Sequence, residues 1–391
     1  MQPLRPLFGA TIVVGILANQ LLPSVSLAQT PPTWWLVQEM KIDGNIADLT
    51  SIGAITQARN GDIFVAQPQD RQIKVFNSTG KFLRTIGHQG QGPGEFEGIS
   101  NIGFVGDTLY AVDDRLPRIT LFRNDGRLIR TIPTQPIGAA ALREDTTVKH
   151  YSTSSPIVLL PNNRAFVMPH ALSDALANGT VTRLSLYRTN WNGEAQKRVA
   201  AIPSFHMWYS MQVGSYRVTG RQPFSDDVNV VIATNGSRIA LVSTDVAAQK
   251  IRIVDLSPNG DTLGTRTVNY APQSIPTRYS DSIAIHFQGL LKGATIAEAR
   301  TKLYLPKSFP AFSSALLGED GTLWLRTSSP INSTNDWAII SAQGKVAATV
   351  TLPKFSRILS VVNGIWVAEY DADDVASVVH YRIDMGNVKH E

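Results

Sequence analysis

Hydrophobic and polar positions alternate along this chain in short runs, which are separated by turns rich in Gly, Asn and Asp. An alternation with a period of two over about four to eight residues predicts β-strands. The clearest unit spans residues 71–86, where two such runs flank a polar turn that ends at Gly80. Glycine adopts the positive φ that a tight hairpin requires. The pattern therefore predicts an all-β fold built from hairpins.

The hairpins recur as an internal repeat. Residues 71–86 and 117–132 align at an offset of 46, with six of sixteen positions identical. A second hairpin with a Gly-Asp turn precedes each of them. Four strands in about 45 residues is the period of a propeller blade. Later units begin at the turns 162–163, 235–236, 320–321 and 363–364. The sequence thus predicts a six-bladed β-propeller.

Ring closure accounts for the two ends of the domain. The last unit lacks a fourth strand, and residues 34–42 form a strand that has no blade of its own. Pairing this N-terminal strand with the last blade would close the ring and remove exposed sheet edges.

Long insertions fall on one predicted face, where the outer-to-inner connections emerge, whereas the short Gly turns fall on the other. The longest insertion, residues 270–311, precedes blade five. In it Ile283, Phe287 and Leu290 recur at helical spacing and Gly293 interrupts the pattern. We expect a pair of short helices over the propeller mouth. Insertions gathered on one face mark a binding face in repeat folds; alternatively, they only cover the channel.

The amino-terminal sequence predicts export. Arg5 precedes a largely apolar run over 7–22, and Ser26 and Ala28 provide small residues for a cleavage site. We therefore expect a signal peptide over 1–28, cut after Ala28, and a single propeller domain over 29–391 that is secreted or periplasmic. An uncleaved anchor is the alternative. No integral membrane segment is expected after cleavage.

The amino-acid composition limits which kinds of binding site and fold stabilisation the chain can have. The 391 residues are 43% hydrophobic and 17% charged, which is typical of a globular protein. The net charge of +5 is scattered, so no basic stripe for nucleic acid is present. The absence of cysteine excludes disulfides and thiolate metal sites. No nucleophile-elbow or paired-histidine metal motif occurs, and we predict neither a cofactor nor a metal.

The segments Gly87–Phe96, Leu109–Asp114 and Arg118–Phe122 resemble an NHL-type repeat. More closely, the chain resembles the bacterial exported six-bladed β-propeller family related to NHL-repeat proteins. Gln222–Ser225 and Leu305–Phe312 are similar to lead-in segments of that family. The resemblance implies the architecture of the whole mature chain but little about its chemistry, because most members have no assigned function.

One cluster of candidate ligand-binding residues lies in the insertion before blade four. Its aromatic and basic side chains suit stacking on a sugar or another flat, partly polar ligand. Alternatively, the same residues form a strand or an apolar plug against blade three. The cluster consists of His206, Trp208, Tyr209, Tyr216 and Arg217.

Two further candidates lie on the same predicted face. Asp113, Asp114 and Arg115 occupy a loop of blade two, where paired carboxylates suit Ca²⁺ binding or acid/base chemistry. Alternatively, an Asp at this position bonds the neighbouring backbone. His286, in the helical insertion, would line the mouth or face solvent.

The sequence favours an extracytoplasmic binding module for a carbohydrate, a peptide or a partner protein. The alternative is a metal-dependent hydrolase or lyase of gluconolactonase-like plan. That enzyme needs Asp, Glu, Asn or His side chains around the axis, whereas the predicted inner strands are mainly apolar, with Asn101 and Asn229 as exceptions. Carboxylates within coordination distance around the axis on the insertion side would favour the enzyme, and an apolar or plugged axis with exposed aromatic residues would favour binding.

Overall fold

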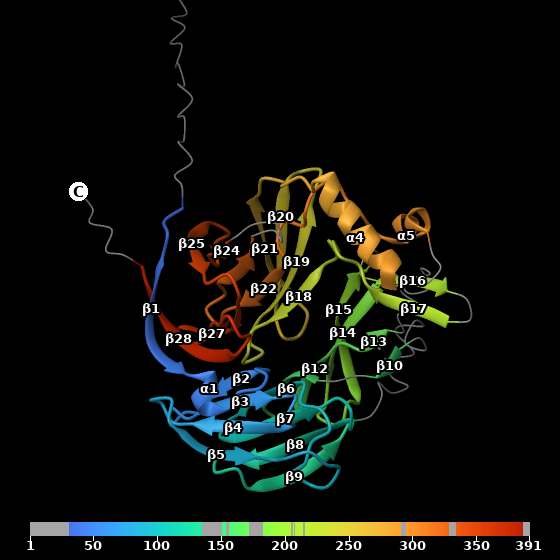
Figure 1. The fold of residues 1–391 in the computed structure, drawn as a ribbon. Coiled ribbons are helices and arrows are strands. Elements are labelled where there is room, and N and C mark those ends of the chain that lie inside the picture. Colours follow the sequence, from blue (N-terminus) through green and yellow to red (C-terminus); the bar gives the residue numbers. More distant parts are fainter. Residues whose placement is uncertain are drawn as a thin grey trace, which may run out of the picture. The chain divides into compact units, whose positions relative to one another are not determined.

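The structure, a computed structural model, describes residues 31–134, 151–153, 156–171, 183–204, 206, 208–213, 216–290, 295–327 and 334–385. The chain divides into Met1–Pro31 and Pro32–Glu391, and the fold is that of the second unit. Six four-stranded antiparallel sheets follow one another around a ring in this unit (Figure 1). The predicted six-bladed β-propeller is confirmed.

Each sheet is one blade, and its strands run from the inner to the outer edge in chain order, except where the ring closes. Blade 1 holds β2 (Ile55–Gln57), β3 (Ile63–Gln67), β4 (Gln72–Phe76) and β5 (Phe82–Ile86). Blade 2 holds β6 (Asn101–Val105), β7 (Thr108–Asp113), β8 (Arg118–Arg123) and β9 (Leu128–Pro133). Blade 3 holds β11 (Pro156–Leu160), β12 (Arg164–Val167), β14 (Arg183–Thr189) and β15 (Ala195–Pro203).

The other three blades follow the same plan. Blade 4 holds β18 (Asn229–Ile232), β19 (Ile239–Asp245), β20 (Lys250–Leu256) and β21 (Thr262–Asn269). Blade 5 holds β22 (Ser314–Leu317), β23 (Leu323–Arg326), β24 (Asn335–Ile340) and β25 (Val346–Leu352). Blade 6 holds β26 (Ser356–Ser360), β27 (Ile365–Tyr370), β28 (Ala376–Asp384) and β1 (Trp35–Ile42).

Apolar side chains hold neighbouring blades together around the whole ring. Each blade-to-blade interface has its own buried cluster, because both faces of a blade pack against a neighbour. The middle strand β3 is buried at every position, whereas the outer strand β5 is mostly exposed. Residues of neighbouring blades that share one of these clusters include Phe64 with Ile102, Tyr110 with Leu159, Val158 with Ile239, Ala240 with Leu323, Trp324 with Ile358, and Trp366 with Ile63.

The two ends of the domain share blade 6. Strand β1 pairs antiparallel with β28, from Trp35 opposite Asp384 to Ile42 opposite Val378. Asp43 then caps the short helix α1 (Gly44–Ala47). The Gly44 amide donates a hydrogen bond of 3.1 Å to Ser377 Oγ, which joins the start of α1 to β28.

Turn chemistry separates the two faces of the ring. Ten of the short hairpin turns contain a glycine with positive φ, where an L-residue with a Cβ would be strained, and the β11–β12 turn uses Asn162 and Asn163 instead. These glycines are Gly61, Gly80, Gly106, Gly126, Gly193, Gly236, Gly260, Gly321, Gly344 and Gly364.

The described insertions lie on the other connections. They are the pairs β10 (Tyr151–Thr153) with β13 (His170–Ala171) and β16 (Trp208–Val213) with β17 (Tyr216–Arg221), and the helices α4 (Thr277–Leu290) and α5 (Ile296–Lys302).

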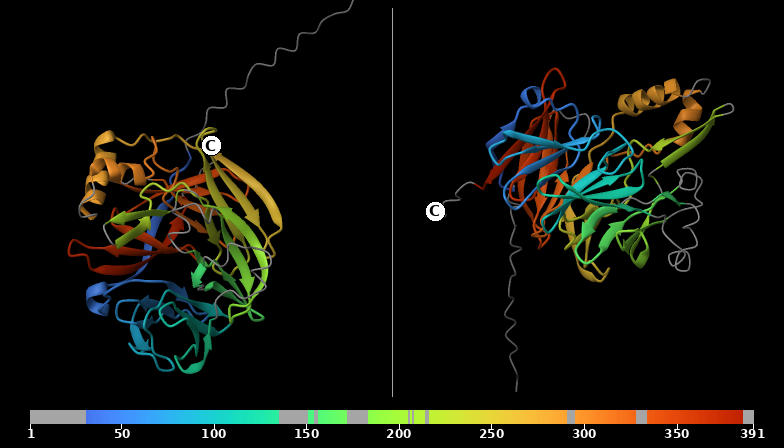
Figure 2. Two further views of the ribbon diagram at one scale, coloured as in Figure 1. Left: turned by 90° about the vertical axis from the view of Figure 1, so that its right-hand side faces the viewer. Right: turned by 90° about the horizontal axis from the view of Figure 1, so that it is seen from below.

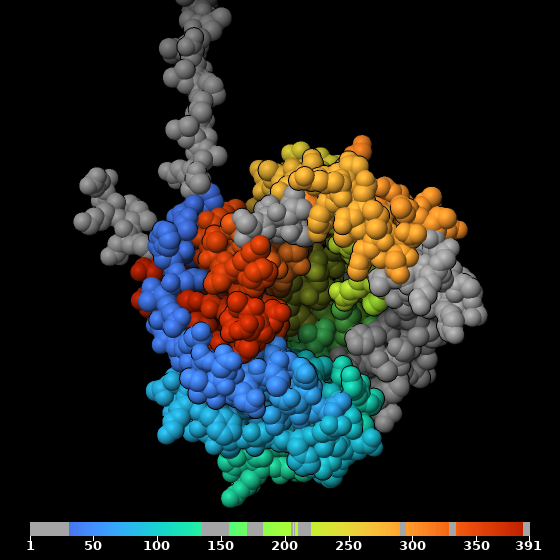
Figure 3. Space-filling view, in the orientation of Figure 1, coloured from blue at the N-terminus to red at the C-terminus, as the bar shows by residue number. Residues whose placement is uncertain are grey.

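The helical pair lies at the rim of this face rather than across its centre. Figure 2 shows α4 and α5 (orange) beside the β16–β17 hairpin, and Figure 3 shows the centre of the face hollowed. Phe287 of α4 and Leu303 after α5 form an apolar cluster with Tyr209 of β16. Gly293, the predicted break, lies outside the described residues. Within the part of the chain that the structure describes, neither helix has the length and apolarity to cross a bilayer.

Candidate functional site

A cavity of about 550 Å³ lies on the ring axis and is lined by residues of all six blades. Its lining includes Arg59, Asn235 and Asn363 in or beside the inner hairpin turns, so the cavity lies toward the short-turn face. Glu319 is the one carboxylate among the lining residues, and it accepts a hydrogen bond of 3.0 Å from Thr234 Oγ1. The described axis therefore lacks a ring of carboxylates.

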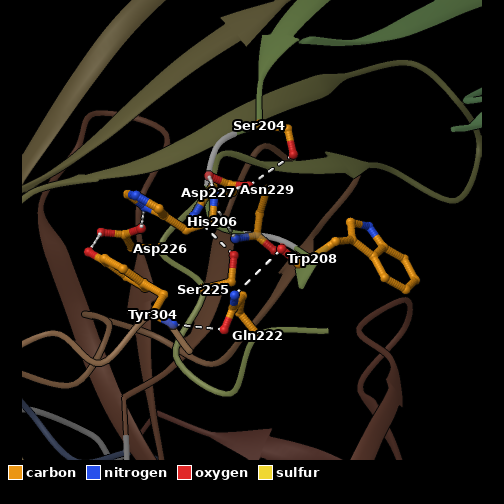
Figure 4. Close-up of polar contacts among 9 residues, drawn as sticks. All are labelled: Ser204, His206, Trp208, Gln222, Ser225, Asp226, Asp227, Asn229 and Tyr304. Atoms are coloured by element: carbon orange, nitrogen blue, oxygen red, sulfur yellow. Dashed lines mark hydrogen bonds and ion pairs between the residues drawn. The ribbon is translucent and has the colours of Figure 1, made fainter. Parts of the chain in front are cut away.

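Polar side chains from three insertion segments converge near the inner strand of blade 4 (Figure 4). Asp226 lies at the centre of this group. Its Oδ1 is 2.9 Å from His206 Nδ1, and its Oδ2 accepts a hydrogen bond of 2.8 Å from the Tyr304 hydroxyl. The His206 and Tyr304 rings stack, with centroids 3.8 Å apart and planes 4° apart. Asp226 thus orients both rings.

Asp227 holds the backbone in the conformation that this group needs. Its side-chain oxygens lie 3.0 and 3.1 Å from the His206 backbone amide, which donates to them. Oδ2 also accepts a hydrogen bond of 2.9 Å from Ser204 Oγ. Asn229, the first residue of β18, donates to the Asp227 carbonyl at 3.1 Å. These contacts tie the segment before β16 to the start of the inner strand.

Gln222 fixes Tyr304 from a third direction. Its Oε1 accepts a hydrogen bond of 2.8 Å from the Tyr304 amide, and its Nε2 donates to the Lys302 carbonyl at 2.9 Å. Because α5 ends at Lys302, this amide side chain joins the end of the helix to the end of β17. Tyr304 is therefore held by both its backbone and its hydroxyl.

The group has a negative electrostatic character. Burial raises the pKa of Tyr304 to about 12, and its hydrogen bond to Asp226 and the charges of Asp226 and Asp227 act in the same direction. Burial also raises the pKa of Tyr270, and the nearby carboxylates of Asp226 and Asp245 add to that effect. Tyr304 is consequently a protonated hydrogen-bond donor at neutral pH.

The β16–β17 hairpin places aromatic residues beside this group. Trp208 faces Arg221 across the hairpin, with the guanidinium carbon 5.7 Å from the ring centroid, a cation–π distance. Tyr209 instead packs edge-on against Phe287, at 4.4 Å between centroids, and burial raises its pKa. Tyr216 and Arg217 lie in β17, but their side chains are outside the described residues.

The blade-two candidates lie elsewhere. Asp113 is buried, and its carboxylate accepts hydrogen bonds from four backbone amides, those of Glu97, Gly98, Arg115 and Leu116, at 2.9–3.1 Å. Asp114 and Arg115 are exposed. The Asp113 carboxylate therefore stabilises the connection between blades 1 and 2.

His286 is exposed on α4, next to the buried Phe287. Sequence reasoning missed Asp226, Asp227 and Tyr304. A usable signal existed for the two aspartates, because they directly follow the lead-in Gln222–Ser225 and precede an inner strand. Tyr304 carries no comparable signal.

Comparison with known proteins agrees with the fold. A family model described as a 6-bladed beta-propeller matches residues 47–135. No curated protein matches the chain. The crystal structure of a member of the duf4221 family from Bacteroides vulgatus is similar over 91% of this chain and 99% of that one, with 10% identity and a TM-score of 0.50.

Two further structures are similar at lower scores. One is a protein described as exported from Bacteroides fragilis, covering 90% of this chain and 95% of that one, with 11% identity and a TM-score of 0.48. The other is a gluconolactonase from Xanthomonas campestris, covering 90% and 99%, with 9% identity and a TM-score of 0.40. The protein is a six-bladed β-propeller, and the resemblance to six-bladed propeller proteins is confirmed at the level of the fold.

Proposed function

We propose that this protein is an exported binding protein that takes its ligand at the group formed by His206, Asp226 and Tyr304, with Trp208 beside it. The supporting observation is the contact between Asp226 and His206 Nδ1, which fixes the imidazole while its side chain remains 42% exposed. A fixed, half-exposed ring presents its other nitrogen to a ligand without an additional ordering cost. The leader-like sequence over 1–28 supports export.

The chemistry of the group favours a carbohydrate over a peptide or a partner protein. Sugar hydroxyls donate to carboxylates and to imidazole nitrogen, and the apolar face of a sugar ring stacks on tryptophan. Asp226 and His206 supply the polar partners, and Trp208, whose ring points away from them in Figure 4, supplies an aromatic face from the same insertion.

Among its described lining residues, the axial cavity on the short-turn face lacks the ligand set of the gluconolactonase-like alternative. A metal-dependent enzyme of that plan needs several oxygen or nitrogen ligands converging on the axis. The described lining offers the single carboxylate Glu319, already bonded to Thr234, with neutral amide side chains around it.

Binding of a panel of neutral and acidic oligosaccharides, measured by calorimetry, tests the proposal. We expect at least one to bind, and Trp208→Ala and His206→Ala each to weaken it by about tenfold or more, a cost of about 1.4 kcal/mol. Phe355→Ala is the matched control, since Phe355 is a 66% exposed aromatic residue on another connection of the same face. Absence of binding across the panel, or unchanged affinity in both variants, would overturn the proposal.

A further inference from the structure

The group around Asp226 has the donor atoms of a metal site. One ligand atom each from His206, Asp226 and Asp227 lies within 4.8 Å of the others. They come from two segments that Asp227 itself ties together through the His206 backbone amide. The convergence is therefore built by the fold and is not a run of neighbouring acidic residues on the surface.

The distance between the ligand atoms of His206 and Asp226 suits a shared ion. Two ligands in adjacent positions on one ion, with bonds of about 2.0–2.2 Å, lie about 3 Å apart. His206 Nδ1 and Asp226 Oδ1 are 2.9 Å apart. An ion between them would replace the Nδ1 proton, which would leave to solvent, because imidazole coordinates in its neutral form.

The remaining hydrogen bonds resemble those that orient metal ligands. Tyr304 donates to the distal oxygen of Asp226, and Ser204 donates to Asp227. The Asp226 carboxylate keeps acceptor capacity beyond its bond to Tyr304, since an ionised carboxylate offers about four lone-pair directions. Outer hydrogen bonds of this kind fix the ligand geometry of metal sites.

The charge of Asp226 also favours a cation at this place. Asp226 is the more exposed of the two aspartates, with 21% of its side chain accessible, and Asp227 is buried. Among the described residues, Asp226 has no lysine or arginine within ion-pair distance; its partners are His206 and the neutral Tyr304 hydroxyl. Part-buried carboxylates need a compensating charge.

We propose that His206, Asp226 and Asp227 bind one divalent transition-metal ion of the zinc or manganese class. One imidazole nitrogen with two carboxylates suits such ions, whereas Ca²⁺ and Mg²⁺ prefer oxygen ligands alone. Three protein ligands leave coordination positions open for water or for an oxygen of a bound molecule. The inference goes beyond the proposed carbohydrate binding and does not depend on it.

Titration with the metal alone provides the test. The full chain, purified without a polyhistidine tag and stripped with EDTA, is titrated with ZnCl₂ and MnCl₂ by calorimetry, and its metal content is measured after desalting. We expect about one equivalent of either ion to bind. Co²⁺ should give a visible absorption band, and excess Ca²⁺ should not displace the bound ion.

Substitutions of single residues test whether Asp226 and His206 are ligands of the metal ion. Asp226→Asn and His206→Ala should each lower the affinity by at least about tenfold and abolish the Co²⁺ band. The double variant Asp373→Asn, Asp374→Asn removes a neighbouring pair of exposed aspartates in blade 6 and should bind like the wild type. Circular dichroism confirms that each variant is folded.

Two outcomes would overturn the metal site: a wild type that retains less than about a tenth of an equivalent, or variants that bind as tightly as the wild type. The metal titration contains no sugar, so its failure would not affect the outcome of the oligosaccharide-binding experiment with Trp208→Ala. Conversely, metal binding without any oligosaccharide binding would overturn only the proposed function.

Discussion

Tyr304 lies flat against His206, with ring centroids 3.8 Å apart, while its hydroxyl bonds the same Asp226 carboxylate that holds the imidazole. One tyrosine therefore braces both partners of an aspartate–histidine pair. It reaches them from the far end of the helical insertion, 78 residues along the chain from Asp226. The stacking and the hydrogen bond can be separated experimentally.

Tyr304→Phe keeps the ring and removes the hydrogen bond. We expect the free energy of unfolding to fall by about 1 kcal/mol, because the lost bond has an ionised acceptor but is partly exposed to water. Urea denaturation measures the change. Tyr279→Phe is the control, since Tyr279 packs against Phe224 and Phe309 through its ring. Equal losses in the two variants would contradict the role given to the Tyr304 hydroxyl.

The raised pKa of Tyr304 predicts a pH dependence in alkaline solution. Its pKa is about 12 in the folded chain, against 10.0 for an ordinary tyrosine. The stabilisation is fully present below pH 10 and is lost as the pH rises toward 12, because the unfolded state ionises first. The difference in unfolding free energy between wild type and Tyr304→Phe should shrink over this range. A constant difference would show that Tyr304 has an ordinary pKa.

Gly44 is required where the first helix meets the last strand. A Cβ at this position would lie 1.9 Å from the carbonyl oxygen of Ala376, at the start of β28. Gly44→Ala should therefore destabilise the domain by about 2 kcal/mol or more. Gly264→Ala is the matched control, since no atom lies within 4 Å of its added Cβ. Thermal denaturation of the two variants should separate them clearly; similar melting temperatures would refute the close contact.

Asp113 should behave as a structural residue. In Asp113→Asn an amide nitrogen replaces one of the oxygens that accept the four backbone hydrogen bonds, which we expect to cost about 1–3 kcal/mol of stability. Asp114→Asn, at an exposed neighbour, should change stability by less than about 0.5 kcal/mol. Urea denaturation checks both values. If Asp113→Asn leaves the free energy of unfolding unchanged, Asp113 is not needed for stability, and a ligand-binding role for this loop becomes the better explanation.

The blades could be predicted from sequence because the alternation and the turn residues that define a hairpin lie within a short stretch of chain. The hairpins at 71–86 and 117–132 repeat the same alternation and the same Gly turns, and the glycines of these turns, Gly80 and Gly126, both have positive φ. A blade's pattern of burial follows from its own strands, since each one packs between two similar neighbours.

The candidate site could be predicted only in part, because its residues meet through insertions that do not repeat. His206 and Trp208 were recognised by their aromatic clustering. Asp226 pairs with His206 from 20 residues away and with Tyr304 from 78 residues away, and no spacing rule links these positions. The bonds of Gln222 to the end of α5 bring Tyr304 into place, and such a contact is visible only in three dimensions.

The pairing of Trp35 with Asp384 has a consequence for biogenesis. Strand β1 is synthesised well before its partner β28, so it must wait for that partner to leave the ribosome. Until then the circle of sheets stays unlocked at blade 6.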